Sequence, residues 1–327
     1  SDVCSSDLMT NVYSFYLCYR IFTMSRFSDR LIERIHATSP VVVGIDPNPR
    51  LMPRFLLPKN TSQEAIKDML LRFSVLVIDH ACHEVAAIKP QSAYFEQFGS
   101  AGISALAEVI AYAKSKELLI ISDIKRGDIG STSTAYAHGY LNHEQSLTNG
   151  LTFTSDLVSD AVTISPFLGE DSFLPFVDIA IENKQGLFIL VKTSNPGSGM
   201  IQDQQINGKT ISQLFAEDLN QMISKFPKGR LGYSSVGAVI GATYADQAAA
   251  LRDRLPHSIF LVPGIGAQGG DIQKMAVNFN SDGLGAVFPI SRGITSIQDK
   301  SISESDYRNH LTTKAKEFST AFQEILI

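Results

Sequence analysis

The stretch LLIISDIKRGDIG, residues 118–130, joins an apolar run to a dense group of charged residues. Its first four residues have the composition of a buried β-strand. Alternate residues of a strand face the same side, so Asp123 and Lys125 should point together into one site, while Asp128 follows Gly127, where the backbone can turn. A lone D-x-K would be explained by a surface ion pair on a loop. The rest of the chain must therefore decide between a surface ion pair and a catalytic site.

Short apolar runs rich in β-branched residues recur eight times along the chain. Continuous runs of this kind suit parallel strands buried on both faces, and the segments between them are long enough for crossover helices. This order predicts an α/β fold, a single-domain (β/α)8 TIM barrel. The runs cover residues 41–45, 85–88, 118–121, 161–164, 186–191, 236–240, 259–262 and 285–288.

Helical patterns lie between several of these runs. Residues 103–116 and 211–226 carry apolar residues at helical spacing. Thr61 can cap a helix, with Glu64 three residues later, and Ser303 begins the last helix.

The composition limits the classes of partner. The chain has 327 residues, 44% hydrophobic and 19% charged, with a net charge of -5, so it has no bulk attraction to nucleic acid and must bind any anion locally. Three cysteines without a C-x-x-C motif predict a reducing compartment, the cytoplasm, without disulfides or zinc. Residues 1–23 lack apolar periodicity and no stretch among them can span a membrane; we expect a non-native or disordered extension before a domain at 24–327.

Polar residues gather where the predicted strands end. In (β/α)8 barrels the active site is built from the loops at the carboxyl ends of the strands, whereas a doubly wound sheet would not need so even a distribution. The strand ends that carry chemistry are Asp46-Pro47-Asn48, Lys89-Pro90-Gln91, Asp123 with Lys125, Ser165-Pro166-Phe167, Lys192-Thr193-Ser194-Asn195-Pro196, residues 263–270 and residues 289–293.

Residues 264–269, GIGAQG, match the G-x-G-x-x-G pattern of dinucleotide-binding folds. The match follows the seventh run rather than the first, and Asp282 precedes the eighth, whereas a ribose-binding acid should end the second strand. This placement argues against a nicotinamide cofactor. Glycine-rich turns at helix N-termini bind anions, and barrels often hold phosphate after strands seven and eight. We therefore predict a phosphate site from Gly266, Gln268, Arg292 and Gly293.

Four histidines are candidate metal ligands by residue type. His80 and His83 have ligand spacing, but they lie on a predicted helix before the second run, at the amino-terminal face of the barrel. His138 and His143 lack acids or cysteines at a recognised spacing. We expect no metal site.

Taken in order, the motifs resemble those of orotidine 5'-phosphate decarboxylases, specifically the subgroup with D-x-K-R-G-D-I-G-S-T, which stands here at residues 123–132. The resemblance covers Met24 to the C-terminus. It implies decarboxylation of orotidine 5'-monophosphate (OMP) to UMP and CO2 in de novo pyrimidine biosynthesis, without cofactor or metal. The further motifs are VGIDPN at 43–48, IKPQ at 88–91, VKTSNP at 191–196, VPGIGAQ at 262–268 and SRGI at 291–294.

The resemblance also implies a role for each matching residue. Lys125 would protonate C6 of the pyrimidine, and residues 195–209 would form a lid. Asp128 and Thr132 would reach the neighbouring subunit's site, which implies a homodimer with shared active sites. The implied catalytic set is Lys89, Asp123, Lys125 and Asp128, and the implied substrate contacts are Asp46, Ile129, Thr132, Pro166, Ser194, Gln268 and Arg292, with Gly266, Gln268, Arg292 and Gly293 at the phosphate.

Two alternatives stay open. Another phosphosugar enzyme of the superfamily, such as a hexulose-phosphate synthase or keto-gulonate-phosphate decarboxylase, shares a D-x-K-x-x-D core but uses Mg2+; Arg126, Gly127 and residues 128–132 argue against it. A catalytically inactive nucleotide-binding protein is the second alternative, and the intact charged set argues against that one.

Overall fold

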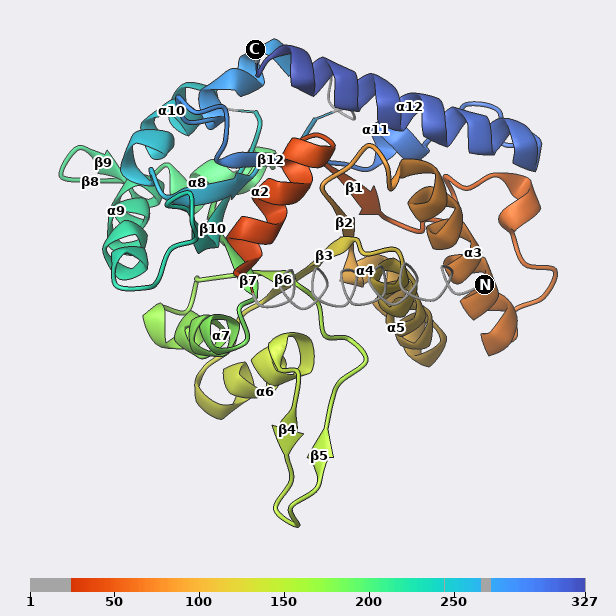
Figure 1. The fold of residues 1–327 in the computed structure, drawn as a ribbon, viewed down its shortest axis with the longest axis horizontal. Helices are drawn as coiled ribbons and strands as arrows, with labels where there is room; N and C mark the ends of the chain where they lie inside the picture. Colours follow the sequence, from red (N-terminus) through yellow and green to blue (C-terminus); the bar gives the residue numbers. More distant parts are fainter. Residues whose placement is uncertain (1–24, 244, 266–271, 327) are drawn as a thin grey trace, which may run out of the picture.

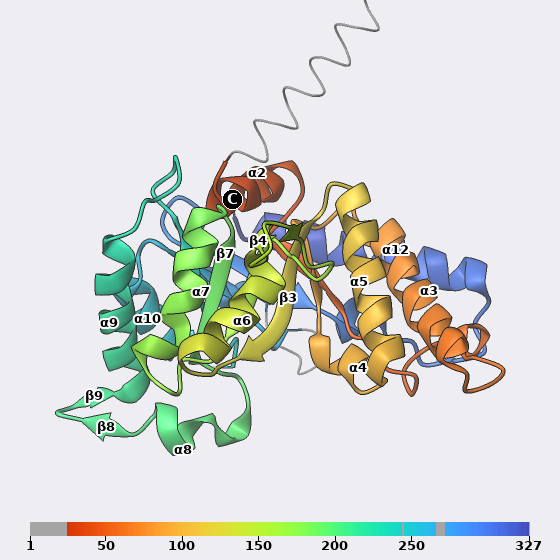
Figure 2. The same cartoon turned by 90° about the horizontal axis from the view of Figure 1, so that it is seen from below.

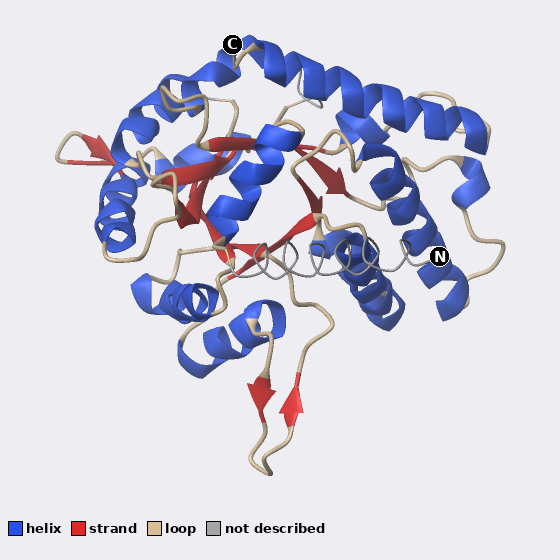
Figure 3. Cartoon of the chain, viewed as in Figure 1, coloured by secondary structure: helices blue, strands red, loops and turns tan. Residues whose placement is uncertain are grey.

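The computed structural model describes residues 25–243, 245–265 and 272–326. Within them, parallel strands close into a barrel in the order β1-β2-β3-β6-β7-β10-β11-β12, with helices around it (Figures 1 and 3). This confirms the predicted (β/α)8 fold, and each predicted apolar run is a strand of the barrel. The strands are β1 (Val41–Ile45), β2 (Ala87–Pro90), β3 (Leu119–Arg126), β6 (Ala161–Ile164), β7 (Gly186–Lys192), β10 (Ser234–Ile240), β11 (Ser258–Leu261) and β12 (Ala286–Ile290).

The helices begin close to their predicted starts. Ser62, rather than Thr61, caps α3, because its hydroxyl accepts from the Ala65 N–H. Ser303 caps α12 as predicted. The α-helices are α2 (Phe27–Ala37), α3 (Gln63–Ala81), α4 (Ser92–Glu96), α5 (Gly99–Ser115), α6 (Gly130–Leu141), α7 (Glu170–Glu182), α8 (Gly199–Gln202), α9 (Ile211–Ser224), α10 (Ala245–Arg254), α11 (Arg292–Thr295) and α12 (Glu304–Glu324). Short 3-10 turns are η1 (Arg54–Leu56), η2 (Pro196–Ser198) and η3 (Ile272–Asn278).

The buried side chains form two clusters, one between the strands and the outer helices and one inside the barrel. Inward positions near the start of a strand are apolar and join the inner cluster. Two residues further along, the same face becomes polar, because side chains two apart on a strand share a face. This change occurs from Ala87 to Lys89 on β2, from Ile121 to Asp123 on β3 and from Ala161 to Thr163 on β6.

Helix α2 covers the amino-terminal end of the barrel (Figure 1). The Phe27 ring meets Phe188 edge to face, with centroids 6.0 Å apart. It lies so close to the start of β7 that a Cβ on Gly186 would be 2.1 Å from a ring atom. In the side view, α2 lies at one end and α4 and α8 lie at the other (Figure 2). The polar strand ends therefore open at the end opposite α2.

Two small hairpins, which the sequence did not predict, interrupt the alternation of strands and helices. Strands β4 (Gln145–Ser146) and β5 (Thr152–Phe153) form one that projects from the side of the barrel (Figure 1). Strands β8 (Gln205–Ile206) and β9 (Lys209–Thr210) form the other, before α9. None of the described helices has both the length and the apolar run that crossing a membrane requires.

Candidate active site

The end of β3 departs from regular strand geometry. Its pairing with β6 is regular up to Ser122 and shifts before Arg126, where four steps along β3 correspond to two along β6. Lys125 lies within this shift with φ of 45°, a left-handed conformation that side-chain-bearing residues seldom adopt. Bulges of this kind re-aim side chains near active sites. Here the bulge carries the charged residues of the predicted motif.

Asp123 lies at the centre of a buried polar network. Its Oδ2 accepts from the Lys89 ammonium at 2.8 Å, and its Oδ1 accepts from Lys125 at 2.5 Å. The Thr163 hydroxyl also donates to Oδ1, at 2.7 Å. Asp123 and Lys89 are both buried, whereas the Lys125 side chain is 44% exposed. The predicted Lys-Asp-Lys part of the charge network is therefore assembled within one chain.

The network fixes the ionisation of its buried members. Burial alone would raise the pKa of the Asp123 carboxyl, but the charges of Lys89 and Lys125 outweigh it and hold that pKa well below its usual range. Burial alone would lower the pKa of Lys89, but Asp123 and then Asp46 outweigh it and raise that pKa above its usual value. Both residues are therefore charged at neutral pH.

Thr163 is the residue of this network that the sequence analysis missed. It lies within the apolar run of β6 and is almost fully buried. A threonine in such a run reads as a strand former, because β-branched residues favour strands. Thr163 lies two positions after Ala161, so both side chains face the inside of the barrel. This spacing was the pattern that would have placed Thr163 beside Asp123.

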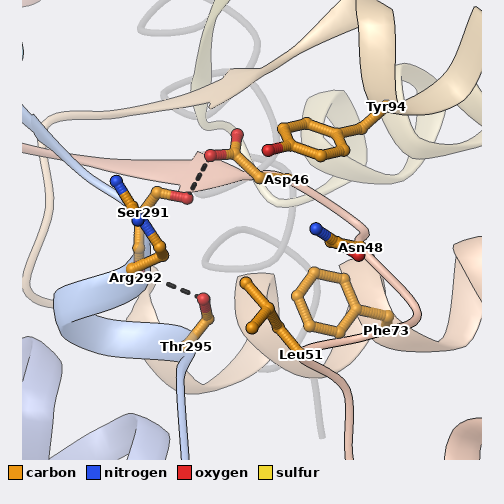
Figure 4. A pocket seen from close by; sticks show the side chains of 8 residues that line it. All are labelled: Asp46, Asn48, Leu51, Phe73, Tyr94, Ser291, Arg292 and Thr295. Atoms are coloured by element: carbon orange, nitrogen blue, oxygen red, sulfur yellow. Dashed lines mark hydrogen bonds between the residues drawn. The ribbon is translucent and has the colours of Figure 1, made fainter. Parts of the chain in front are cut away.

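Asp46 and Arg292 border one pocket (Figure 4). The Ser291 hydroxyl donates to Oδ2 of Asp46, while Oδ1 is buried without a hydrogen-bond partner among the described residues. Tyr94, on α4, directs its hydroxyl toward Asp46 (Figure 4). Arg292 is exposed at the first position of α11, and a Cβ on Gly293 would be 2.8 Å from the Phe318 ring. The pocket thus joins the ends of β1 and β12.

The remaining predicted contacts lie at the same end of the barrel. Pro166 and Ser194 follow β6 and β7 and are half-buried, while Ile129 is 55% exposed. Gly127 is needed for close approach rather than for the turn we expected: a Cβ there would be 2.8 Å from the Ser165 carbonyl oxygen. Gly266 and Gln268 lie outside the described residues.

Among the described residues, Asp128 and Thr132 make no hydrogen bond or ion pair with Lys89, Asp123 or Lys125. Asp128 is half-buried, and its carboxylate accepts from the Ile129 backbone N–H at 2.8 Å. Thr132 is exposed in the first turn of α6. Across residues 25–243, 245–265 and 272–326, no ion pair includes Asp128.

The predicted lid, residues 195–209, is anchored at its base. The buried ammonium of Lys192 contacts Asp203 at 2.7 Å and Ser198 at 3.2 Å. The Thr193 N–H donates to the side-chain oxygen of Gln202 at 2.9 Å. Beyond these contacts, the β8–β9 hairpin extends outward from the rim (Figure 2).

Comparison with known proteins gives the family. The sequence model described as Orotidine 5'-phosphate decarboxylase / HUMPS family matches residues 39–302. The chain belongs to the orotidine 5'-phosphate decarboxylase family. It is 43% identical to the orotidine 5'-phosphate decarboxylase of Rhodopirellula baltica over 279 residues, which are 83% of this chain and 88% of that protein. It is 37% identical to that of Caldicellulosiruptor bescii over 277 residues, 83% and 90% of the two chains.

The structures agree with this family assignment. The OMP decarboxylase of Leishmania donovani superimposes with a TM-score of 0.69 at 28% identity, covering 92% of this chain and 98% of that one. The family description also includes the HUMPS group, but the relatives above are orotidine 5'-phosphate decarboxylases. The function predicted from the motifs is thus confirmed.

The other motifs have structural roles in this decarboxylase fold. His80 contacts the Thr312 hydroxyl, and His138 contacts Asn142. Asp282, whose position before the eighth strand argued against a ribose-binding role, accepts from the Tyr233 hydroxyl at 2.9 Å. Among the described residues, no three His, Cys, Asp or Glu side chains are grouped to hold a metal ion.

Proposed function

We propose that Lys125, held by Asp123 and Lys89, carries out the decarboxylation of OMP that family membership assigns to this chain. The observation that supports this most directly is the Lys89–Asp123–Lys125 contact at the carboxyl ends of β2 and β3. It combines a buried acid that is ionised at neutral pH with a partly exposed ammonium. Because the Lys125 ammonium is already partly exposed, it can contact a bound substrate without a change in its burial.

The reaction demands a cation beside C6 of the pyrimidine. When the bond between C6 and the carboxylate breaks, CO2 leaves and the electron pair stays on C6, in the ring plane and without a conventional electron sink. A fixed ammonium stabilises that carbanion more than the ground state, which lowers the barrier. Lys125 then transfers its proton to C6 to give UMP, and solvent reprotonates the lysine. Asp123 lies beside the departing carboxylate and positions Lys125. Lys89 contacts Asp123 from the other side and completes the group of three charges.

The pocket beside this network suits the sugar and the phosphate. The unpartnered Oδ1 of Asp46 can accept from a ribose hydroxyl, and Arg292 can pair with the phosphate. Gly266, Gln268 and Gly293 are proposed to complete the phosphate site. Ser194 is proposed to contact the base, and Pro166 and Ile129 to form the apolar wall near the carboxylate.

The lack of a contact between Asp128 and the charged residues of its own chain, among the described residues, supports a homodimer with shared active sites. We expect Asp128 and Thr132 to complete the site of the neighbouring subunit, since neither joins the network of its own chain. Mixing inactive Lys125→Ala and Asp128→Ala proteins should restore activity, because a mixed dimer holds one site with both native residues. No recovery despite demonstrated subunit exchange would exclude the arrangement.

A decarboxylase assay in excess EDTA tests the function. Loss of OMP absorbance should proceed at the same rate with and without the chelator, because the proposed chemistry uses only side chains. Strict dependence on Mg2+ would favour the hexulose-phosphate synthase alternative. Binding of UMP without turnover would favour an inactive nucleotide-binding protein.

Two broader expectations complete the proposal. The cytoplasm is the expected location, because the sparse cysteines suit a reducing compartment and this reaction belongs to nucleotide synthesis. Residues 24–327 are expected to form the decarboxylase domain, and proteolysis followed by the OMP assay would test this boundary.

A further inference from the structure

We propose that Thr163 is a positioning residue for the reaction: its hydroxyl ties the carboxylate of Asp123 to the backbone of Lys125. The inference rests on the proposed roles of Asp123 and Lys125 in decarboxylation. Thr163 does not face the solvent, because it is 1% exposed, and it reaches the reaction only through its two neighbours.

The hydrogen-bond directions at Thr163 are determined by chemistry. The Lys125 backbone N–H can only donate, and it lies 3.1 Å from the Thr163 Oγ1. The ionised Asp123 carboxylate can only accept, and its Oδ1 lies 2.7 Å from the same oxygen. A hydroxyl has one hydrogen and two lone pairs, so it donates to Asp123 and accepts from Lys125. Both bonds form together without competition.

The hydroxyl compensates for the bulge. Thr163 pairs regularly with Phe188 on β7, whereas Lys125 lies in the register shift between β3 and β6. The shift takes the Lys125 N–H out of the regular ladder, and a buried N–H without a partner would be costly. The Thr163 side chain supplies that partner where the β6 backbone does not. It therefore stabilises the left-handed backbone of Lys125, φ 45°.

This anchor affects the position of the reactive ammonium. The Lys125 side chain is 44% exposed and flexible, so the region that its Nζ can reach depends on where its backbone is fixed. The same Asp123 oxygen that accepts from Thr163 also accepts from the Lys125 ammonium. One hydroxyl thus fixes both the start of the lysine side chain and the carboxylate at its end.

Three variants separate positioning from general stability. Thr163→Val keeps the shape of the side chain and removes both hydrogen bonds, while Thr163→Ser restores the hydroxyl. Ser122→Ala is the matched control. Ser122 lies on β3 directly before Asp123, so its side chain is on the opposite face of the strand. The change removes a buried hydroxyl contact of 2.6 Å with Ser159, and Ser159 keeps its bond to the Leu157 carbonyl.

We expect Thr163→Val to lower kcat for OMP by about 10- to 100-fold, because a hydrogen bond to a charged group is lost near the reacting atoms. KM for OMP and the Kd of UMP, measured by titration calorimetry, should change by less than about threefold, since Thr163 does not contact the ligand. Thr163→Ser should recover most of kcat. Ser122→Ala should lower Tm comparably while kcat stays within about twofold of the wild type.

Each contrary result has a definite meaning. A folded Thr163→Val protein with wild-type kcat, a Thr163→Ser protein as slow as Thr163→Val, or an equal loss of kcat in Ser122→Ala would overturn the inference. If Thr163→Val does not fold, Thr163→Ala carries the same expectation, with the same outcomes deciding. An inactive wild type would instead reject the proposed function, so the two failures are distinguishable.

Discussion

Replacing Lys125 by alanine should nearly abolish turnover while leaving the fold and nucleotide binding intact. The side chain that is lost is the proposed proton donor and the cation beside the developing carbanion. Asp123 keeps its contacts with Lys89 at 2.8 Å and with Thr163 at 2.7 Å, so its buried charge stays compensated. The fold therefore does not depend on Lys125 in the way that the reaction does.

The two effects differ greatly in size. Loss of a general acid costs about 10²- to 10⁴-fold, and loss of a preorganised electrostatic contact costs about 10²- to 10³-fold. Together they lower kcat by roughly 10⁴- to 10⁷-fold, or about 5 to 10 kcal/mol of transition-state stabilisation. The Lys125 side chain is 44% exposed, so solvent screens its ion pair, and its loss should lower the free energy of unfolding by only about 1 kcal/mol.

The assay is the decrease of OMP absorbance, combined with UMP titration calorimetry and urea unfolding. Lys314→Ala is the matched control: its ammonium is paired with Glu317 at 2.6 Å, its side chain is 38% exposed, and it lies on α12, outside the Lys89–Asp123–Lys125 contact. This control should keep full activity and lose a similarly small amount of stability.

Two results would refute the reasoning. A Lys125→Ala protein with kcat within about tenfold of the wild type would show that another group protonates C6. A variant that is inactive but also loses several kcal/mol of stability, in contrast to Lys314→Ala, would show that Lys125 holds the fold rather than the reaction.

The remaining predictions concern pH, phosphate and the lid. Because the folded pKa of Asp123 is lowered, its contribution to stability is present above the unfolded carboxyl pKa of about 3.9 and is lost as the pH falls below it, so urea midpoints should fall more steeply in acid for the wild type than for Asp123→Asn. Because the folded pKa of Lys89 is raised, its contribution to stability is present below the unfolded lysine pKa of about 10.4 and is lost as the pH rises further. Urea midpoints that stay constant above that pH would contradict this. Arg292→Ala should raise KM for OMP by about 10- to 100-fold with little change in unfolding, and an unchanged KM would remove Arg292 from the phosphate site. Lys192→Met should lower the free energy of unfolding by about 2 kcal/mol, which is less than for a fully buried pair because the Asp203 side chain is 34% exposed. A Lys192→Met/Asp203→Asn double variant should recover part of this loss. A double variant less stable than the single one would show that the two side chains are not coupled.

The barrel was predictable because its strands have a simple pattern. The run at residues 41–45 is apolar throughout, as a strand buried on both faces must be, and the structure reproduces that range. Local details depended on weaker differences. Thr61 and Ser62 are adjacent residues of equal capping chemistry, so the sequence alone could not choose between them. Gln145–Ser146 is too short to show the alternation that identifies a strand.

The candidate site was predictable where charge interrupts an apolar run. Lys89, Asp123 and Lys125 are conspicuous for that reason, and the structure brings them into contact. Thr163 was not conspicuous in the sequence, because threonine is a common strand residue and needs no further explanation there. Asp203 was missed because its partner, Lys192, lies eleven positions away, and only the folded path of residues 195–202 joins them.

Helix α2 closes the amino-terminal end of the barrel (Figure 1). Phe27 and its neighbours fill the amino-terminal end, so OMP must arrive, and UMP and CO2 must depart, through the rim at the carboxyl ends of the strands. Traffic in both directions then passes the segment at residues 195–209. A change in this rim would therefore act on substrate entry and on product release together.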